Sequence, residues 1–95
     1  MLYLNIWLTV KDPGDVEKVR SLLAEQGRLS RLEPGCVSFE VFHSQSDNTR
    51  FLLNERWESQ QTLDAHRQGK AYTTIYQPEV LPRVTREPHP STLVE

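Results

Sequence analysis

Apolar side chains occupy every second position of residues 2–10, a period of two that is typical of a β-strand. One face carries Leu2, Leu4, Ile6, Leu8 and Val10, and the other carries Tyr3, Asn5, Trp7 and Thr9. Because neither face is strongly polar, we expect both sides of this strand to be covered.

A helical spacing follows the turn-forming residues 12–15. The apolar positions that share one helical face are Val16, Val19, Leu22, Leu23 and Leu29. Glu33 precedes Pro34, and a residue before proline favours extended backbone, so the helix should end near Leu32.

Two further alternating runs, at about 36–43 and 50–57, are separated by the polar residues 44–49 and predict an antiparallel hairpin. Ser59 is a suitable N-cap for a second helix, which Gly69 should break. A short helical piece then carries Tyr72, Ile75 and Tyr76, and Pro78 and Pro82 should end helical structure. Because prolines suit only sheet edges and bulges, we interpret residues 83–95 as an irregular fourth strand that could reach a partner subunit.

The resulting order, β-α-β-β-α-β, is that of the ferredoxin-like α+β fold with an antiparallel sheet. We expect residues 1–95 to form one such domain. Two helices cover one face of a four-stranded sheet, and in so short a chain a second copy is the economical cover for the other face. A homodimer is therefore expected.

Composition narrows the functional classes. The net charge of −2, without a basic stripe, argues against nucleic-acid binding, and no apolar run is long enough to span a membrane. One cysteine and the lack of a basic leader favour a cytoplasmic protein. The scattered histidines have no metal-ligand spacing and the four glycines form no phosphate-binding loop, so neither a metal nor a dinucleotide cofactor is predicted.

The stretch 33-EPGCVSFEVFHSQSD-47 contains the only cysteine and one of three histidines. Cys36 and His43 are seven residues apart, so in a regular strand they point to opposite faces and lie roughly 23 Å from each other. Unless a bulge intervenes, they cannot form a reactive pair. We interpret Gly35 as a turn residue with a permissive backbone angle and Cys36 as a small buried residue.

Three motifs together resemble the antibiotic biosynthesis monooxygenase family: EPGCVSFEV at 33–41, LLNERWES at 52–59 and LDAH at 63–66. The resemblance implies a homodimeric α+β barrel with a ligand pocket between sheet and helices. Family members include cofactor-independent monooxygenases of phenolic and quinol substrates, haem-degrading enzymes and a signal-molecule isomerase. Where many members have a second histidine followed by an aromatic residue, this chain has Ala71 and Tyr72. Haem-degrading members usually have a histidine ligand further along this segment, and residues 70–76 contain no histidine, so haem binding ranks low.

Oxygenation without a cofactor requires a proton acceptor, a dry cavity and polar groups that stabilise a substrate anion. Imidazole exchanges protons near neutral pH, so His66 is the first catalytic candidate, a packing role being the alternative. The other candidates are catalytic Asn5 and Asn54, and substrate-binding Trp57, Trp7, Tyr72 and Phe39. Glu55 is predicted to be structural and paired with an arginine such as Arg20, Arg56 or Arg67, since an isolated buried carboxylate is costly.

The leading hypothesis is therefore a cofactor-independent monooxygenase that uses dioxygen and a small aromatic, quinol or polyketide-like substrate. Two alternatives stay open. The chain could be a non-catalytic dimeric module that binds a small molecule or serves assembly, or it could be an isomerase of a small carbonyl metabolite.

Overall fold

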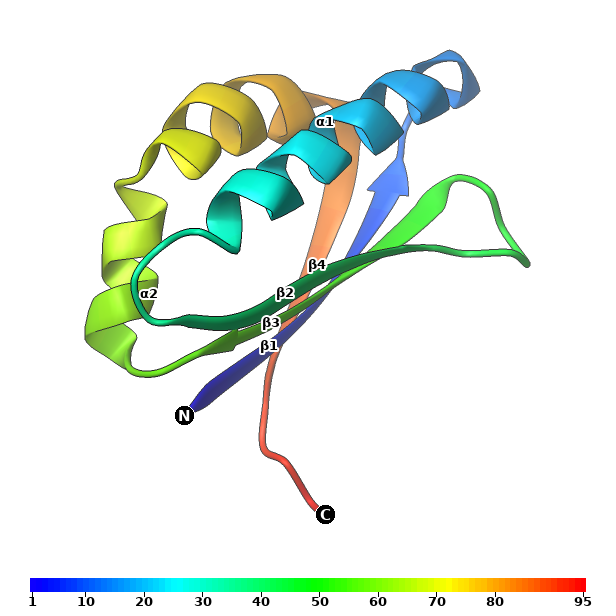
Figure 1. Ribbon diagram of the computed structural model, residues 1–95. Coiled ribbons are helices and arrows are strands. Elements are labelled where there is room, and N and C mark those ends of the chain that lie inside the picture. The colour runs from blue at the N-terminus through cyan, green and yellow to red at the C-terminus, as the bar shows by residue number, and fades with distance from the viewer.

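A computed structural model describes all 95 residues of the chain. Two helical segments lie above a four-stranded sheet and a shorter helix closes one end (Figure 1). The strands are β1 (Leu2–Val10), β2 (Cys36–His43), β3 (Arg50–Trp57) and β4 (Val84–Ser91). The helices are α1 (Val16–Ser30), α2 (Gln60–Arg67) and the π-helical η2 (Ala71–Val80), with 3-10 turns η1 (Pro13–Asp15) and η3 (Leu81–Arg83).

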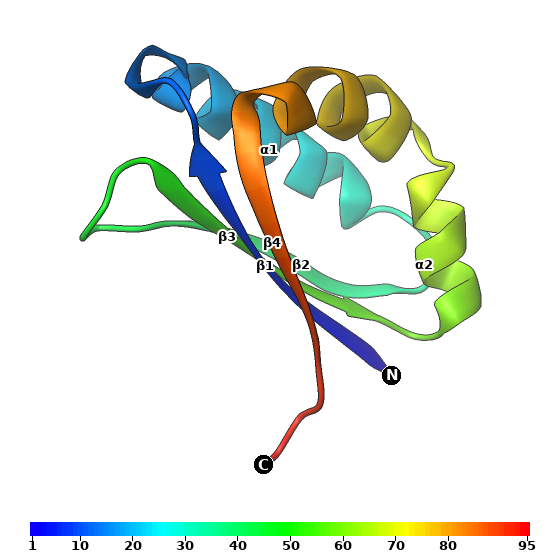
Figure 2. The ribbon, with the colours of Figure 1, turned by 180° about the vertical axis from the view of Figure 1, so that it is seen from behind.

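The strand order is β2-β3-β1-β4, and all neighbouring strands are antiparallel. This arrangement confirms the ferredoxin-like prediction, including the limits of the hairpin strands. β4 contains Pro88 and Pro90 and lies at an edge of the sheet. An edge strand tolerates proline, because no further strand needs a hydrogen bond from the missing N–H groups. Seen from behind, β4 runs along the side opposite β2 (Figure 2).

The hydrophobic core lies between the sheet and the helices. The even-numbered residues of β1 from Leu4 to Val10 are buried there, together with Phe39, Leu53 and Trp57. From above, α1 contributes Val19 and Leu23. We refer to this side of the sheet as the inner face and to the opposite side as the outer face.

Two details differ from the sequence-based predictions. Helix η2 continues through Pro78 to Val80, because burial of Tyr76 and Val80 holds its last turn against the core although Pro78 lacks an N–H. A bulge lies between Cys36 and Ser38, which pair with Trp57 and Arg56 respectively. It turns Cys36 to the inner face, the face of His43, but the two residues remain at opposite ends of β2.

The turn before β2 fixes the position of α2. Gly35 has a φ of +81°, a backbone conformation that favours glycine, as the Pro-Gly turn predicts. A β-carbon at Gly35 would lie only 2.3 Å from Cγ2 of Thr62. Thr62 and Ser59 form the capping box that begins α2. The turn and the first turn of α2 therefore pack with no space between them.

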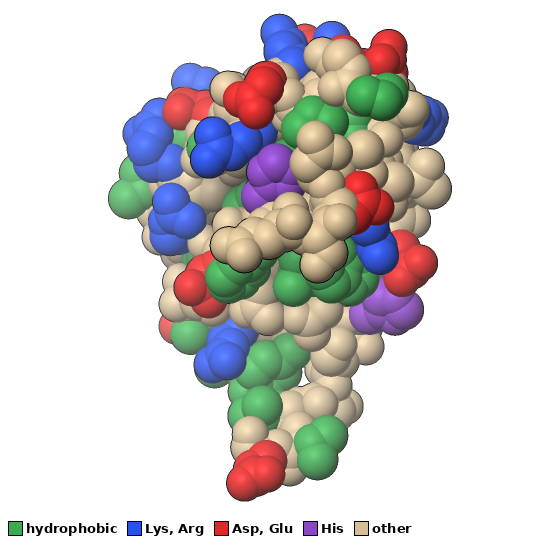
Figure 3. Space-filling view, turned by 90° about the vertical axis from the view of Figure 1, so that its right-hand side faces the viewer, with side chains coloured by type: hydrophobic (Ala, Val, Ile, Leu, Met, Phe, Trp, Pro, Cys, Tyr) green, Lys and Arg blue, Asp and Glu red, His purple; other side chains and the backbone are tan.

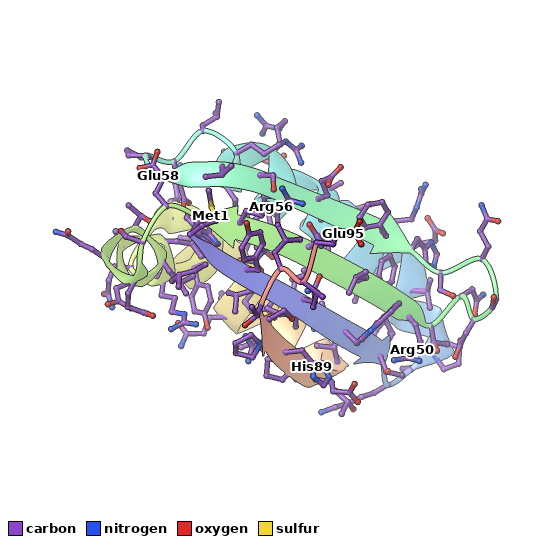
Figure 4. The ribbon with its side chains drawn as sticks, turned by 90° about the horizontal axis from the view of Figure 1, so that it is seen from below. Met1, Arg50, Arg56, Glu58, His89 and Glu95 are labelled. Carbon is purple, nitrogen blue, oxygen red and sulfur yellow. The ribbon has the colours of Figure 1, made fainter.

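No helix covers the outer face, which carries polar and aromatic side chains. Seen from below, this face shows Arg50 and Arg56 toward opposite ends of the sheet (Figure 4). The Arg50 guanidinium lies 4.6 Å from the Trp7 ring centre, and that of Arg56 lies 5.3 Å from Tyr3. Hydrophobic side chains gather on the same underside, below the β2–β3 turn (Figure 3). Phe42 of β2 is 50% exposed.

Candidate functional site

His66 lies on the inner side of α2 and is only 4% exposed. Its Nδ1 is 2.6 Å from Oε1 of Glu33, in the turn after α1. A carboxylate only accepts hydrogen bonds, so Nδ1 carries the proton and donates a hydrogen bond to Glu33. The same bond leaves Nε2 as the unprotonated nitrogen of the neutral ring. His66 is therefore held in the tautomer that can accept a proton through Nε2.

Aromatic rings from three elements surround the imidazole. Trp57 of β3 lies 4.5 Å from it between ring centres, Tyr72 of η2 lies 5.7 Å away edge-on, and Phe39 of β2 lies 5.9 Å away. Three of the predicted substrate-binding residues thus meet the predicted catalytic histidine. Such walls exclude water and can stack with an aromatic ligand.

Glu55 is the second titratable group of this region and is 4% exposed. Its Oε1 accepts a hydrogen bond of 3.0 Å from the indole Nε1–H of Trp57, so the predicted arginine partner is wrong. The indole is the only side-chain donor to the carboxylate, and it comes from the same strand. Burial raises the pKa of Glu55, although the indole bond, the charge of His66 when its ring is protonated, and the positive charges of Arg86 and Arg67 act in the opposite direction. Glu55 therefore retains its proton to higher pH than an exposed glutamate does.

A small cavity of about 10 Å³ lies between these groups, and this is about the space of one water molecule. Its polar lining consists of Gln26, Glu55, His66, Arg67, Tyr72, Tyr76 and Arg86. The Arg86 Nε–H donates a 3.0 Å hydrogen bond to the Tyr76 hydroxyl, and burial raises the pKa of Tyr76 to about 12. A polar cavity with titratable groups and aromatic walls is the arrangement expected of a small catalytic site.

Two open hollows flank this cavity. The end pocket, about 420 Å³, lies where β1 begins and shares Leu4, Leu63 and Arg67 with the cavity. The side pocket, about 600 Å³, lies between the end of α1 and α2 and shares His66 with the cavity. Only a few side chains thus separate the polar cavity from spaces large enough for a small aromatic molecule.

Asn5, Asn54 and Trp7 point to the outer face, so the sheet separates them from His66. The Asn54 amide donates to Oδ1 of Asn5 at 2.7 Å, and the Asn5 amide donates to the Ser91 hydroxyl at 3.0 Å. The two asparagines form a polar ladder across β3, β1 and β4. Within one chain, the three outer residues do not belong to the His66 site.

Cys36 and His43 do not form a reactive pair. Burial, together with the nearby carboxylates Glu33 and Glu55, raises the pKa of the Cys36 thiol to about 11, so the nucleophilic thiolate is scarce at neutral pH. His43 stacks on Phe51 at 4.1 Å and hydrogen-bonds the Asn48 carbonyl. No three His, Cys, Asp or Glu side chains gather into a set that could hold a metal ion.

Sequence reasoning did not assign Glu33, Gln26, Tyr76 or Arg86 to the site. Gln26 could have been found, because it continues the inner stripe of α1 through Val19 and Leu23. Arg86 pairs with Leu8 across the β1–β4 register and is therefore on the inner face. The sequence of this strand has no clear alternation, so it does not assign Arg86 to either face. Glu33 was recognised only as part of a turn motif.

A model of the antibiotic biosynthesis monooxygenase family matches residues 1–77 of this chain. The chain belongs to this family. Family membership agrees with the fold and with the motifs around Gly35, Trp57 and His66. No helix is long and apolar enough to cross a membrane.

Solved structures show the same fold across nearly the whole chain. A crystal structure of an antibiotic biosynthesis monooxygenase is 23% identical, covers 100% of both chains and has a TM-score of 0.90. A Bacteroides thetaiotaomicron protein described as a possible oxidoreductase is 21% identical over 95% of this chain and 94% of its own, with a TM-score of 0.87. Rv0793 from Mycobacterium tuberculosis is 25% identical, covers 100% of this chain and 98% of its own, and has a TM-score of 0.82.

A shorter sequence match connects the chain to the uncharacterized protein sll1783 of Synechocystis. The two are 38% identical over 37 residues, which is 39% of this chain and only 25% of that relative.

Proposed function

We propose that the protein is a cofactor-independent monooxygenase acting on a small phenolic, quinol or polyketide-like substrate. The observation that carries the proposal is His66, fixed by Glu33 on one side and lining a buried polar cavity on the other. Family membership and the aromatic walls support the same reaction class.

In the proposed reaction, Nε2 of His66 removes a proton from a substrate hydroxyl, and Glu33 stabilises the imidazolium that forms. The electron-rich substrate anion passes one electron to dioxygen, and the substrate radical and superoxide combine to a peroxide anion. The His66 imidazolium returns its proton to this anion and gives the hydroperoxide. Loss of water from the hydroperoxide gives the oxidised product. The substrate gains one oxygen atom and loses two hydrogens, and the second oxygen atom leaves as water, so the substrate itself supplies all the electrons.

The surroundings of His66 favour this chemistry. Trp57 and Phe39 form buried walls beside His66, and the anion can interact with the Tyr72 and Tyr76 hydroxyls and with Arg86, which lies at the solvent-exposed side of the cavity. Burial raises the pKa of Glu55, so this carboxyl repels a substrate anion less at a given pH than an exposed glutamate would.

Oxygen uptake against a panel of quinols and anthrone-like phenols tests the proposal. We expect uptake by the wild type, and a decrease in kcat of about 100-fold or more in His66→Gln, the usual size of a general-base contribution. His89→Gln is the matched control, because His89 is exposed on β4 and pairs only with Glu87. Equal uptake by His66→Gln and the wild type would remove His66 from the mechanism.

Isomerisation of a small carbonyl compound is the second candidate, because His66 and Glu55 line the same cavity and could move a proton between two carbon atoms. Transfer of solvent deuterium into an enolisable ketone, measured by NMR without oxygen uptake, would favour this candidate over the oxygenase.

We also propose a homodimer in which the outer faces of two sheets pack together. The uncovered sheet, the half-exposed Phe42 and the exposed tail residues Leu93 and Val94 support this arrangement. The C-terminal segment projects away from the helices on the outer side of the sheet (Figure 1). Sedimentation equilibrium should give a dimer at micromolar concentration, and Phe42→Glu should shift it toward monomer. A monomeric wild type would contradict the proposal.

A further inference from the structure

Gln26 and Ser30 are the two buried polar side chains of α1 whose oxygen atoms have no hydrogen-bond partner in the protein. Of the two, only Gln26, which is 1% exposed, lines the polar cavity. Its Oε1 is buried and has no hydrogen-bond partner in the protein. A buried acceptor without a donor destabilises the folded state, whereas an apolar side chain of the same size would not. Gln26 is therefore equipped for a partner that the protein does not supply.

Two arginines line the same cavity, and both also reach the solvent. Arg67 of α2 forms no ion pair or side-chain hydrogen bond, and Arg86 of β4 uses only its Nε–H, on the Tyr76 hydroxyl. Guanidinium groups bind oxyanions through paired N–H donors. Glu55 lines the cavity too, but it is bonded to Trp57. The cavity thus offers one neutral acceptor and two free cationic donors.

We propose that Gln26 is a substrate-binding residue whose Oε1 accepts a hydrogen bond from a neutral hydroxyl of the substrate, while Arg67 and Arg86 bind an ionised oxygen of the same molecule. The substrate class is then an aromatic or enolic compound with at least two oxygens, one protonated and one ionised. This inference rests on the proposed function in one respect: both take the cavity beside His66 as the place where the substrate binds.

The small cavity must enlarge when such a ligand binds, because about 10 Å³ holds no more than one water molecule. The end pocket provides the space, since only Leu4, Leu63 and Arg67 are common to both. Leu4 belongs to the central sheet, whereas Leu63 and Arg67 belong to the short helix α2. Movement of α2 side chains therefore joins the two spaces, and Arg67 meets the incoming ligand first.

Binding of chromogenic phenols tests the proposal without any turnover. The probes are 4-nitrocatechol, which keeps one hydroxyl when its other oxygen is ionised, 4-nitrophenol, which has only the ionised oxygen, and uncharged 4-nitroanisole. Dissociation constants are measured by absorbance titration of the intact protein under argon. Gln26→Met removes the acceptor at nearly constant volume, and Gln77→Met is the control, because Gln77 is exposed and lines no cavity.

We expect Gln26→Met to weaken 4-nitrocatechol binding about tenfold, the size of one hydrogen bond to a buried group, and to leave 4-nitrophenol binding unchanged. Arg67→Gln and Arg86→Gln should each weaken both ionised probes at least tenfold and leave 4-nitroanisole binding unaffected. The melting temperature of Gln26→Met should equal or exceed that of the wild type, whereas a structural role for Gln26 would lower it.

Equal 4-nitrocatechol affinity of Gln26→Met and the wild type would overturn the role of Gln26, and so would an equal loss for both phenols. Failure of the ionised probes to bind the wild type would overturn the whole proposal. Probe binding with these variant effects, but without oxygen uptake from any quinol, would instead reject the monooxygenase and retain the substrate site.

Discussion

The two faces of the sheet carry one tryptophan each, and the two residues have opposite environments. Trp57 on the inner face is completely buried, lies 4.5 Å from His66 between ring centres with the two rings tilted by 36°, and donates a hydrogen bond from its indole N–H to Glu55. Trp7 on the outer face is partly exposed and lies beneath the Arg50 guanidinium. The inner residue connects packing to a titratable site, whereas the outer residue belongs to a surface that remains open in the single chain.

The faces also differ in how they satisfy polar groups. On the outer face, Asn54, Asn5 and Ser91 hydrogen-bond one another across three strands. On the inner face, Gln26 Oε1 has no partner, and Glu55 has only the indole as a hydrogen-bond donor. The Arg50 Nε–H on the outer face is also buried without a partner, but of these unpaired groups only Gln26 lines a cavity. The difference assigns ligand chemistry to the inner face.

The two tryptophans provide the strongest test of this contrast. Trp57→Ala should lower the free energy of unfolding by about 4 kcal/mol, because it opens a cavity and leaves Glu55 without its donor. Trp7→Ala should cost about 1 kcal/mol, the size of a partly exposed cation–π contact. Urea unfolding followed by circular dichroism gives both values. Similar losses for the two variants would show that the outer face is packed as tightly as the inner one.

Gly35→Ala tests how α2 covers the inner face. Alanine would have to adopt the left-handed backbone angle of Gly35, which strains any residue with a β-carbon, and its β-carbon would overlap the Thr62 side chain. We therefore expect a loss of about 3 kcal/mol in unfolding free energy. Gly14→Ala is the control, because a β-carbon there meets only the exposed Asp12 carboxylate at 3.3 Å, and its effect should stay within about 0.5 kcal/mol. Equal melting temperatures of the two variants would contradict the tight contact between the turn and α2.

Alternation along β1 and β3 was sufficient to predict the sheet, because a period of two assigns each side chain to a face once one face is buried. It could not reveal the bulge at Cys36, which depends on how the Gly35 turn meets the strand. Helix propensity likewise predicts an end at Pro78. The helix continues to Val80 instead, because burial of Val80 outweighs the cost of the proline. The Glu33 partner of His66 is 33 residues away and comes from a tertiary contact that spacing does not encode. Trp57 is next to Glu55 on the same face of β3, so alternation places the two side chains together but does not show that they hydrogen-bond.

Glu55→Gln tests the buried carboxyl through the pH dependence of stability. Burial raises the folded-state pKa of Glu55 above its ordinary value of 4.5. Below pH 4.5, both the folded and the unfolded states bind the proton. As the pH rises toward the folded-state pKa, the unfolded state ionises first, so wild-type stability falls. Glutamine still accepts the Trp57 N–H but does not ionise.

The stability of Glu55→Gln relative to the wild type should therefore increase as the pH rises from 4.5. Urea unfolding of both proteins at a series of pH values measures this difference. A difference that is constant with pH, or one that changes in the wild type's favour, would contradict the raised pKa.

The smallest expected effect concerns Asn5 and Asn54, the candidate catalytic residues that lie on the outer face. A double-mutant cycle of Asn5→Ala and Asn54→Ala should give a coupling of about 0.5–1 kcal/mol in unfolding free energy, since one neutral hydrogen bond joins the two amides at 2.7 Å. Both single variants should keep kcat within about threefold of the wild type in the oxygen-uptake assay, because the sheet separates the asparagines from His66. A 100-fold loss of kcat in either variant, with the sedimentation behaviour unchanged, would show that the outer face takes part in catalysis.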